Sequence, residues 1–371
     1  VSGKDGPRLF EALKVPGGGA DSLHLTQGFH TYPKRLHPHI PQILLKQAPK
    51  GGLLYDPFMG SGTVLLEGLL KGLKVVGSDL NPMACLIARE RCRWLSLRNA
   101  QRVWTEVELI RQSIESEKLG TSLVSHSHSK WLKNLYPPHL LVEMLHWFDR
   151  IRQLQDPAIR ECLRTVFSSL VYRFTPDSGE SRGRSRVPRG QFGRAMSERT
   201  QTLIRAQTVL AEKIRHADPP ELKCRDFLEI QSEELAKADL LISRPPFPGS
   251  ARQLRGQELL LKWVGLYDKN IQSKILGTEA DFHKRNWIPR FRRMMLNMRH
   301  STTPGGKCYL YAEDWLERDR REDALEFMKK FSRSEGWTLD STASRRIPSI
   351  VHEQKAYETT GKWESLVLLR N

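Results

Sequence analysis

Two short stretches of the sequence combine glycine and carboxylate residues in a spacing suited to holding a small molecule. The first, DPFMGSGT, runs from Asp56 to Thr63, and the second, DLNP, begins at Asp79. Gly60 and Gly62 are free to adopt positive φ, which lets backbone N–H groups approach a ligand with no Cβ in the way. An acid about 20 positions later, at the end of the next strand, is placed to accept hydrogen bonds from the two hydroxyls of a ribose. Asp79 holds that position.

Two common nucleotide sites fit this stretch poorly. A P-loop needs a lysine after its last glycine, and GSGT has none, so a triphosphate would lack its cation. A dinucleotide turn of the form GxGxxG is incomplete, because Leu65 stands where the third glycine is due and the next glycine is Gly68. The P-loop is thereby excluded, whereas a dinucleotide fold stays open.

The glycine turn resembles the cofactor motif of the S-adenosylmethionine-dependent amino-methyltransferases that act on DNA. In that family the motif commonly reads DPFxGSGT, and the second strand ends in DxNP. The matching residues here are Asp56, Pro57, Phe58, Gly60, Ser61, Gly62, Thr63, Asp79, Asn81 and Pro82. The resemblance implies S-adenosylmethionine as the cofactor and no metal.

Two further segments extend the resemblance in both directions, over roughly residues 24 to 371. Upstream, GFHTYPKRLHPHIPQILL is similar to the segment with HxYP that lines the methionine end of the cofactor, here His30, Tyr32 and Pro33. The histidines at 30, 37 and 39 could suggest a metal triad, which the family does not need. Downstream, CRDFLEI resembles the third cofactor strand, and its Asp226 is expected to meet the adenine amino group.

A second signature of the family, [DNS]PP[YFW], grips the exocyclic amine of the target base. The match here is ISRPPFPG, in which the candidate catalytic residues are Ser243, Arg244, Pro245, Pro246 and Phe247. The aromatic ring is expected to stack on the base. The mechanism implied is direct attack of the amine on the sulfonium methyl, with the enzyme supplying orientation.

Arg244 departs from the family pattern, because cytosine-N4 enzymes usually have serine directly before the two prolines. An amine becomes more nucleophilic when its hydrogens point at acceptors, and a guanidinium offers only donors. Three interpretations stay open. Ser243 substitutes through a local shift, or the backbone carbonyls of Arg244 and Pro245 suffice while the arginine turns to phosphate, or catalysis is weak.

The surrounding pattern predicts the elements that must position these residues. Apolar runs at GGLLYDPF and LKVVGSDLNP flank the helical spacing of GTVLLEGLLKG, and this strand, helix, strand order is a βαβ unit with a parallel sheet. Strand signals return at ADLLIS, GGKCYLYAED and WESLVLLRN. The predicted fold is α/β, the Rossmann-like class I methyltransferase fold that the resemblance implies, with a mostly parallel seven-stranded sheet and a helical insertion.

Composition shifts divide the chain into four segments. Residues 1–23 are expected to be a flexible lead-in, and residues 24–100 carry the first part of the methyltransferase domain with the cofactor motifs. Residues 101–200 form a helical insertion that ends in a basic loop over 176–199, rich in arginine, glycine and serine. Residues 201–371 complete the domain and carry the catalytic motif.

Charge favours a polyanionic partner. The chain has 59 lysines and arginines against 42 aspartates and glutamates, a net charge of +17, and basic proteins of this kind commonly bind nucleic acid. Double-stranded DNA is the expected partner, with the target base flipped out of the duplex. The residues expected to contact its backbone are Arg182, Arg184, Arg186, Arg189, Arg194, Arg199 and Arg252.

Cysteine usage bounds both compartment and chemistry. The five cysteines show no CxxC spacing, which argues against a zinc site or a disulfide framework and fits a reducing compartment. None follows a proline, which disfavours the cytosine-C5 chemistry. No apolar run approaches the roughly 20 residues of a membrane span. We expect an intracellular protein; the first residue not being methionine, the divergent SRPPF and the basic loop favour a eukaryotic nucleus over a bacterial cytoplasm.

Several functions stay open at this point. FHTYPKRLHP, the serine of SRPPF and the PFPG continuation favour transfer to cytosine N4 in DNA, and adenine N6 is the closest alternative. An RNA amine is a further one, although no recognisable RNA-binding module occurs in the sequence. A degenerate methyltransferase domain that only binds nucleic acid is the non-enzymatic alternative, favoured by Arg244 and disfavoured by the intact cofactor motifs.

Overall fold

A single twisted sheet carries both sequence signatures. The computed structural model describes residues 1–15, 24–117, 132–175, 187–214, 217–248, 257–277, 284–317, 320–347 and 363–371. The sheet strands are β1 (Leu53–Asp56), β2 (Lys74–Asp79), β3 (Glu221–Cys224), β4 (Ala238–Ser243), β5 (Thr302–Glu313), β8 (Thr338–Arg346) and β9 (Trp363–Arg370). Their spatial order is β3-β2-β1-β4-β5-β9-β8.

The pairing of these strands confirms the predicted sheet. Strands β1 to β5 pair in parallel, and β9 runs antiparallel to both of its neighbours, β5 and β8. The strand order reverses direction between β1 and β4, where the chain leaves one half of the sheet and begins the other. A two-stranded ribbon of β6 (Trp315–Glu317) and β7 (Arg320–Glu322) follows β5. The observed architecture is the predicted α/β fold with a mostly parallel, seven-stranded sheet.

Helices cover both faces of the sheet, which explains the continuous apolar runs of its strands. Side chains alternate between the two faces, so that Leu54 of β1 joins one core and Tyr55 joins the other. The first core is closed by α1 (Gly6–Leu13), α2 (His39–Leu44) and α3 (Thr63–Leu70). The second is closed by α11 (Lys284–His300) and α12 (Ala324–Ser334).

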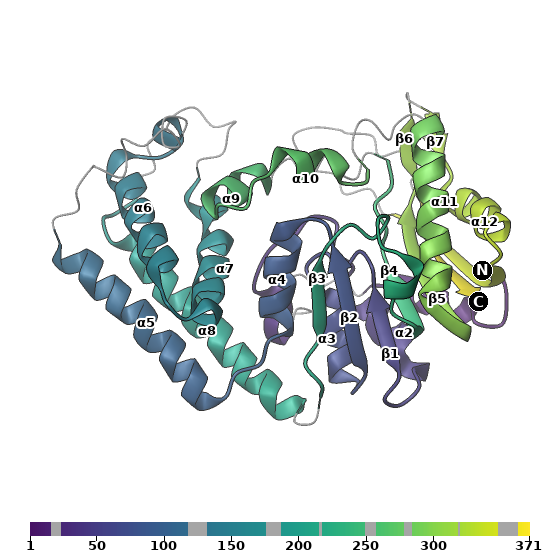
Figure 1. The fold of residues 1–371 in the computed structure, drawn as a ribbon, viewed down its shortest axis with the longest axis horizontal. Helices are drawn as coiled ribbons and strands as arrows, with labels where there is room; N and C mark the ends of the chain where they lie inside the picture. The colour runs from purple at the N-terminus through teal and green to yellow at the C-terminus, as the bar shows by residue number, and fades with distance from the viewer. Residues whose placement is uncertain are drawn as a thin grey trace.

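The helical insertion forms a bundle with a core of its own, at the end of the molecule beyond α4 (Figure 1). Its helices are α5 (Leu97–Ser116), α6 (Pro138–Gln153), α7 (Pro157–Phe174) and α8 (Gln191–Lys213). Two short helices, α9 (Glu258–Trp263) and α10 (Lys269–Lys274), run from this bundle back towards α11 (Figure 1). No helix in the described ranges has both the length and the hydropathy to cross a bilayer.

Three boundaries differ from the sequence-based expectation. Part of the expected lead-in is ordered, because α1 buries Leu9 and Leu13 in the first core and Ser2 pairs with Thr342 of β8. The expected loop over 176–199 is helical from Gln191 onward, so α8 crosses the expected boundary at residue 200. The third strand ends at Cys224, which places Asp226 in the turn that follows it.

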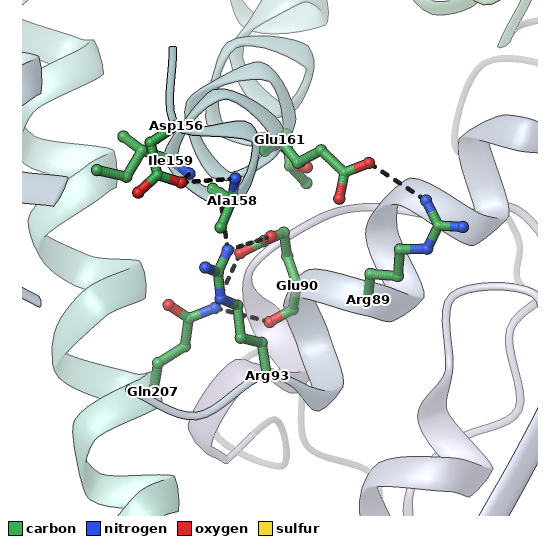
Figure 2. Close-up of polar contacts among 9 residues, drawn as sticks. Arg89, Glu90, Arg93, Asp156, Ala158, Ile159, Glu161 and Gln207 are labelled. Atoms are coloured by element: carbon green, nitrogen blue, oxygen red, sulfur yellow. Dashed lines mark hydrogen bonds and ion pairs between the residues drawn. The ribbon is translucent and has the colours of Figure 1, made fainter. Parts of the chain in front are cut away.

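The helix α4 (Pro82–Cys92) joins the bundle to the sheet. Met83 and Ile87 pack in the bundle core, whereas Ala88 packs in the first sheet core. Figure 2 shows the polar contacts at this junction: the buried Glu90 accepts hydrogen bonds from Arg93 at 2.9 Å and from Gln207 of α8 at 3.1 Å. The bundle is therefore held to the sheet by polar contacts as well as by apolar packing.

Two arginines at the carboxyl end of α4, Arg89 within the helix and Arg93 directly after it, make this junction testable. Arg93 also donates to the carbonyl oxygen of Ala158 in α7 at 2.8 Å, whereas Arg89 pairs with Glu161 at 3.2 Å in solvent (Figure 2). Arg93→Ala leaves the buried Glu90 carboxylate without its cation and should lower the free energy of unfolding by about 2–3 kcal/mol, allowing for partial exposure. Chemical denaturation measures this change.

Arg89→Ala is the matched control, because exposed ion pairs contribute less than about 1 kcal/mol. Equal effects of the two substitutions on the denaturation midpoint would show that the Glu90 contacts do not stabilise the junction.

Candidate active site

A pocket of about 390 Å³ opens at the carboxyl ends of the parallel strands, where the strand order reverses. Its size is in the range of small-molecule sites, and its place is where open α/β sheets bind their ligands. Both sequence signatures contribute to its walls, the glycine turn on one side and the PPF loop on the other. The predicted residues that line it are Tyr32, Pro33, Asp56, Pro57, Phe58, Gly60, Ser61, Thr63, Asp79, Asn81, Asp226, Arg244, Pro245, Pro246 and Phe247.

The two glycines of the turn have different roles. Both have positive φ, +48° at Gly60 and +78° at Gly62. Gly60 lines the pocket, and its N–H donates to the Asp79 carboxylate at 2.9 Å. Gly62 lies behind the pocket wall, where a Cβ would come within 3.0 Å of the Cβ of Ala88 in α4, and its N–H donates to the Met59 carbonyl oxygen. Both N–H groups thus donate within the protein, which corrects our expectation that they face a ligand, and Gly62 instead allows close packing on α4.

Asp79 is fixed at the end of β2 by two backbone donors. Its oxygens accept from the N–H groups of Gly60 at 2.9 Å and Asn81 at 2.8 Å. Burial raises the pKa of this carboxyl to about 6. The Asn81 side chain donates in turn to Tyr32 at 3.2 Å and to Gln257 at 2.7 Å. The acid of the second strand and the tyrosine of the HxYP segment are thus brought into one network.

Asp56 connects the glycine turn to the end of β4, where the PPF loop begins. Its carboxylate accepts from the Ser243 hydroxyl at 2.7 Å and from the Phe58 N–H at 3.1 Å, and burial raises its pKa to about 7. Ser243 is fully buried and does not line the pocket. Its hydroxyl is therefore engaged beneath the turn, which counts against the interpretation that Ser243 replaces the missing acceptor.

Arg244 is held within the protein. Its guanidinium donates to the carbonyl oxygen of Lys34 at 2.6 Å and to Glu313 at 2.7 Å, and it stacks over the ring of Tyr311. Lys34 reaches the other oxygen of Glu313 at 2.8 Å. Burial acts to raise the pKa of Glu313, but Arg244 and Lys34 together hold it below its ordinary value. The side chain, which one of the three interpretations turned towards phosphate, instead joins the HxYP segment to the end of β5.

Phe247 borders the pocket from within an aromatic cluster. Only 6% of its surface is exposed. The centroid of its ring lies 5.4 Å from the ring centroid of Trp315, 5.9 Å from that of Phe291 and 6.0 Å from that of Trp287. The ring therefore belongs to the second sheet core and presents a limited surface to the pocket.

His30 lies outside the pocket wall, contrary to our expectation. Its ring contacts the Thr31 carbonyl oxygen at 2.7 Å and the Ser168 hydroxyl of α7 at 3.0 Å, and burial lowers its pKa to about 4. The neutral ring ties the HxYP segment to the bundle. Within the described part of the chain, no group of three or more histidine, cysteine or acidic side chains is arranged to hold a metal ion.

The expected DNA-contacting arginines divide into three groups. Arg182, Arg184, Arg186 and Arg252 lie outside the described residues. Arg189 and Arg194 are exposed, before and within α8. Arg199 donates to the carbonyl oxygen of Phe29 and stacks over its ring at 5.0 Å, so its guanidinium is used inside the protein.

Several residues of the pocket were missed by sequence reasoning. Phe227 lies beside Asp226 and packs edge-to-face on Phe58 at 5.6 Å, and only its position after the expected acid could have indicated it. Glu313 ends β5 and Trp315 begins β6, 66 or more residues after the PPF loop. No motif surrounds them, and only strand pairing brings them to the site.

Sequence comparison gives two partial relatives among characterised proteins. The chain is 41% identical over 75 residues to type II methyltransferase M.MvaI of Kocuria varians, covering 19% of this chain and 16% of that protein. It is 31% identical over 77 residues to type II methyltransferase M.MjaII of Methanocaldococcus jannaschii, covering 20% and 14%. The chain thus matches about a sixth of the length of these relatives. No family model matches the sequence.

Solved structures give only loose likenesses. TrmN from Thermus thermophilus aligns over 91% of this chain and 49% of its own at 12% identity, with a TM-score of 0.36. A putative RNA methyltransferase from Pyrococcus horikoshii aligns over 92% and 88% at 9% identity, also with a TM-score of 0.36. These alignments are too loose to assign a function. Over about a fifth of its length the chain is thus similar to two type II methyltransferases.

Proposed function

We propose that this protein transfers a methyl group from S-adenosylmethionine to the exocyclic N4 amine of cytosine in DNA. The observation that carries the proposal is the convergence, in one pocket, of the glycine turn with its ribose acid and the PPF loop. The partial relatives, both named as type II methyltransferases, support methyl transfer. The +17 net charge supports a nucleic acid as the substrate.

The cofactor would lie along the strand ends. Asp79, which already accepts two backbone hydrogen bonds, has its carboxylate at the pocket wall and would accept from the ribose hydroxyls. Asp226 and the rings of Phe58 and Phe227 would surround the adenine. Tyr32 and Pro33 would lie beside the amino-acid end, where Ser61 and Thr63 of the turn also reach the pocket.

The target amine would meet backbone carbonyls rather than a side chain before the prolines. Ser243 is engaged by Asp56, and Arg244 is engaged by Glu313 and Lys34. The carbonyl oxygens of Arg244 and Pro245 remain as the acceptors that the family motif uses. In this arrangement the Arg244 side chain acts as a strut that fixes the loop bearing these carbonyls.

The chemistry is a direct displacement. The amine nitrogen attacks the methyl carbon in line with the carbon–sulfur bond, the electron pair of that bond returns to sulfur to give S-adenosylhomocysteine, and the methylated amine releases one proton to solvent. The protein contributes alignment of the two reactants, which supplies much of the rate in such reactions. The pocket presents the base only after it leaves the duplex, with Arg189, Arg194 and the arginines outside the described residues contacting phosphate.

A non-enzymatic role is the second candidate, and one observation favours it. Phe247 is 6% exposed and packed among three aromatic rings, which leaves little of its face for a base. A nucleic-acid-binding subunit that has lost its chemistry would keep such a ring as core. Two alternative methyl acceptors, adenine N6 and an RNA amine, would be recognised by the methylated nucleoside that the reaction yields.

The first prediction concerns the product. Incubation of the protein with S-adenosylmethionine and mixed-sequence duplex DNA should yield N4-methylcytosine by mass spectrometry of the nucleosides, with single-stranded DNA and RNA in parallel. N6-methyladenine would keep the mechanism and overturn the base assignment. Absence of product on every substrate, with S-adenosylhomocysteine still bound, would favour the non-enzymatic role.

Cofactor affinity should depend on pH through Asp79. Only the ionised carboxylate accepts from both ribose hydroxyls, and its pKa is about 6, so affinity for S-adenosylhomocysteine should fall as the pH drops through about 6. Asp79→Asn should bind weakly at every pH and lose this step. Asp56→Asn is the matched control and should keep it. The affinity is measured by calorimetric titration at several pH values between 5 and 8. This range extends about one unit below the pKa of Asp79, about 6, and one unit above that of Asp56, about 7.

Arg244→Ala tests the strut. Without its contacts to Lys34 and Glu313 the loop carbonyls lose their position, and a misplacement of about 1 Å costs up to about 100-fold in rate. We expect kcat to fall by up to about 100-fold. The affinity for S-adenosylhomocysteine should stay within about threefold of that of the unaltered protein, a difference well under 1 kcal/mol. An unchanged kcat would remove Arg244 from the mechanism.

A further inference from the structure

A buried arginine that has no carboxylate partner among the described residues lies directly behind the glycine turn. Arg91, in the last turn of α4, is 1% exposed. Its guanidinium donates to the hydroxyl oxygens of Ser61 and Thr63, the latter at 3.3 Å. It also donates to two carbonyl oxygens of the upstream segment, those of Gln27 at 3.2 Å and His30 at 3.1 Å. All four acceptors are neutral.

No carboxylate neutralises this charge in the part of the chain that the structure describes. Glu67 belongs to the same network through Gln27, but its oxygens accept from Gln27 and Gln42, and one of them lies 3.2 Å from Nε2 of His24. The Arg91 Nε has no hydrogen-bond partner among the described residues, and burial lowers the pKa of the guanidinium to about 9. A second cation, Arg35, lines the pocket and donates to the Gln27 carbonyl oxygen at 2.7 Å.

An unpaired buried charge is costly, so its retention points to an anion that the protein alone does not contain. The direction of the hydrogen bonds indicates where that anion sits. A guanidinium only donates, so Ser61 and Thr63 act as acceptors towards Arg91 and keep their own hydroxyl hydrogens for another partner. Both residues line the pocket, whereas Arg91 does not. The turn therefore presents two polarised hydroxyl donors to the ligand side.

We propose that Arg91 is a positioning residue that turns the Ser61 and Thr63 hydroxyls into donors for the carboxylate at the amino-acid end of the cofactor. The inference rests on the proposed function, because it assumes that the pocket binds S-adenosylmethionine. The carboxylate accepts from the two hydroxyls, and the charges of Arg91 behind them and Arg35 beside them stabilise it. Arg91 thereby selects for cofactors that carry the amino-acid carboxylate.

The test compares two ligands that differ at this end. S-adenosylhomocysteine has the amino-acid carboxylate, and 5′-methylthioadenosine keeps the adenosine and the sulfur but lacks the amino acid. Hydrogen bonds to charged groups contribute about 1.5–3 kcal/mol. Arg91→Met should therefore lower the affinity for S-adenosylhomocysteine by about 10- to 100-fold. The affinity for 5′-methylthioadenosine should change by less than about threefold, well under 1 kcal/mol. Isothermal titration calorimetry measures both.

Ser61→Ala is the companion variant, because it removes one proposed donor and leaves the buried charge in place. Ser61→Ala should also lose affinity for S-adenosylhomocysteine selectively. It carries the test by itself if Arg91→Met does not fold. If both variants lose affinity equally for the two ligands, Arg91 and Ser61 only maintain the shape of the turn. That result would overturn this inference and leave the proposed function standing. Failure of the unaltered protein to bind either ligand would overturn the proposed cofactor site, and this inference with it.

Discussion

The close approach of the glycine turn to α4 is the contact on which the rest of the site depends. Gly62 takes positive φ and lies so near Ala88 that any Cβ would crowd it. This contact brings the turn over Arg91, which holds Ser61 and Thr63 from below. On the other side of the turn, the Gly60 N–H reaches the Asp79 carboxylate. One tight contact between a turn and a helix thus sets the spacing of the acid, the hydroxyls and the buried charge.

The same helix couples the pocket to the bundle. One side of α4 contributes Met83 and Ile87 to the bundle core. Glu90 in its last turn contacts α8, and Arg93 directly after the helix contacts α7 (Figure 2). His30 adds a second tie, from the HxYP segment to α7. The bundle is therefore fixed relative to the pocket by α4, the helix against which the glycine turn packs.

The arginine before the two prolines shows how a motif departure is absorbed by its surroundings. Its positive charge is neutralised by Glu313 at the end of the neighbouring strand, and its planar group stacks on Tyr311. Because β4 pairs with β5, the two ends lie side by side and the contact needs no rearrangement. Lys34 closes the network from the HxYP segment. An arginine at this position weakens the motif as an amine acceptor. It also joins two walls of the pocket, because Arg244 contacts both Lys34 and Glu313.

The sequence by itself determined the parallel sheet, the glycine turn and the place of Asp79. Those features depend on local periodicity, on glycine, and on an acid at a strand end, all of which neighbouring residues specify. Only the tertiary structure decided that Gly62 packs against α4, that Ser243 is bound to Asp56, and that His30 faces the bundle. It also brought Glu313 to Arg244 and buried Arg91 among neutral acceptors, with no carboxylate partner in the described ranges. These outcomes depend on which distant segments share a strand end or a helix face, and no pattern within a single segment encodes that.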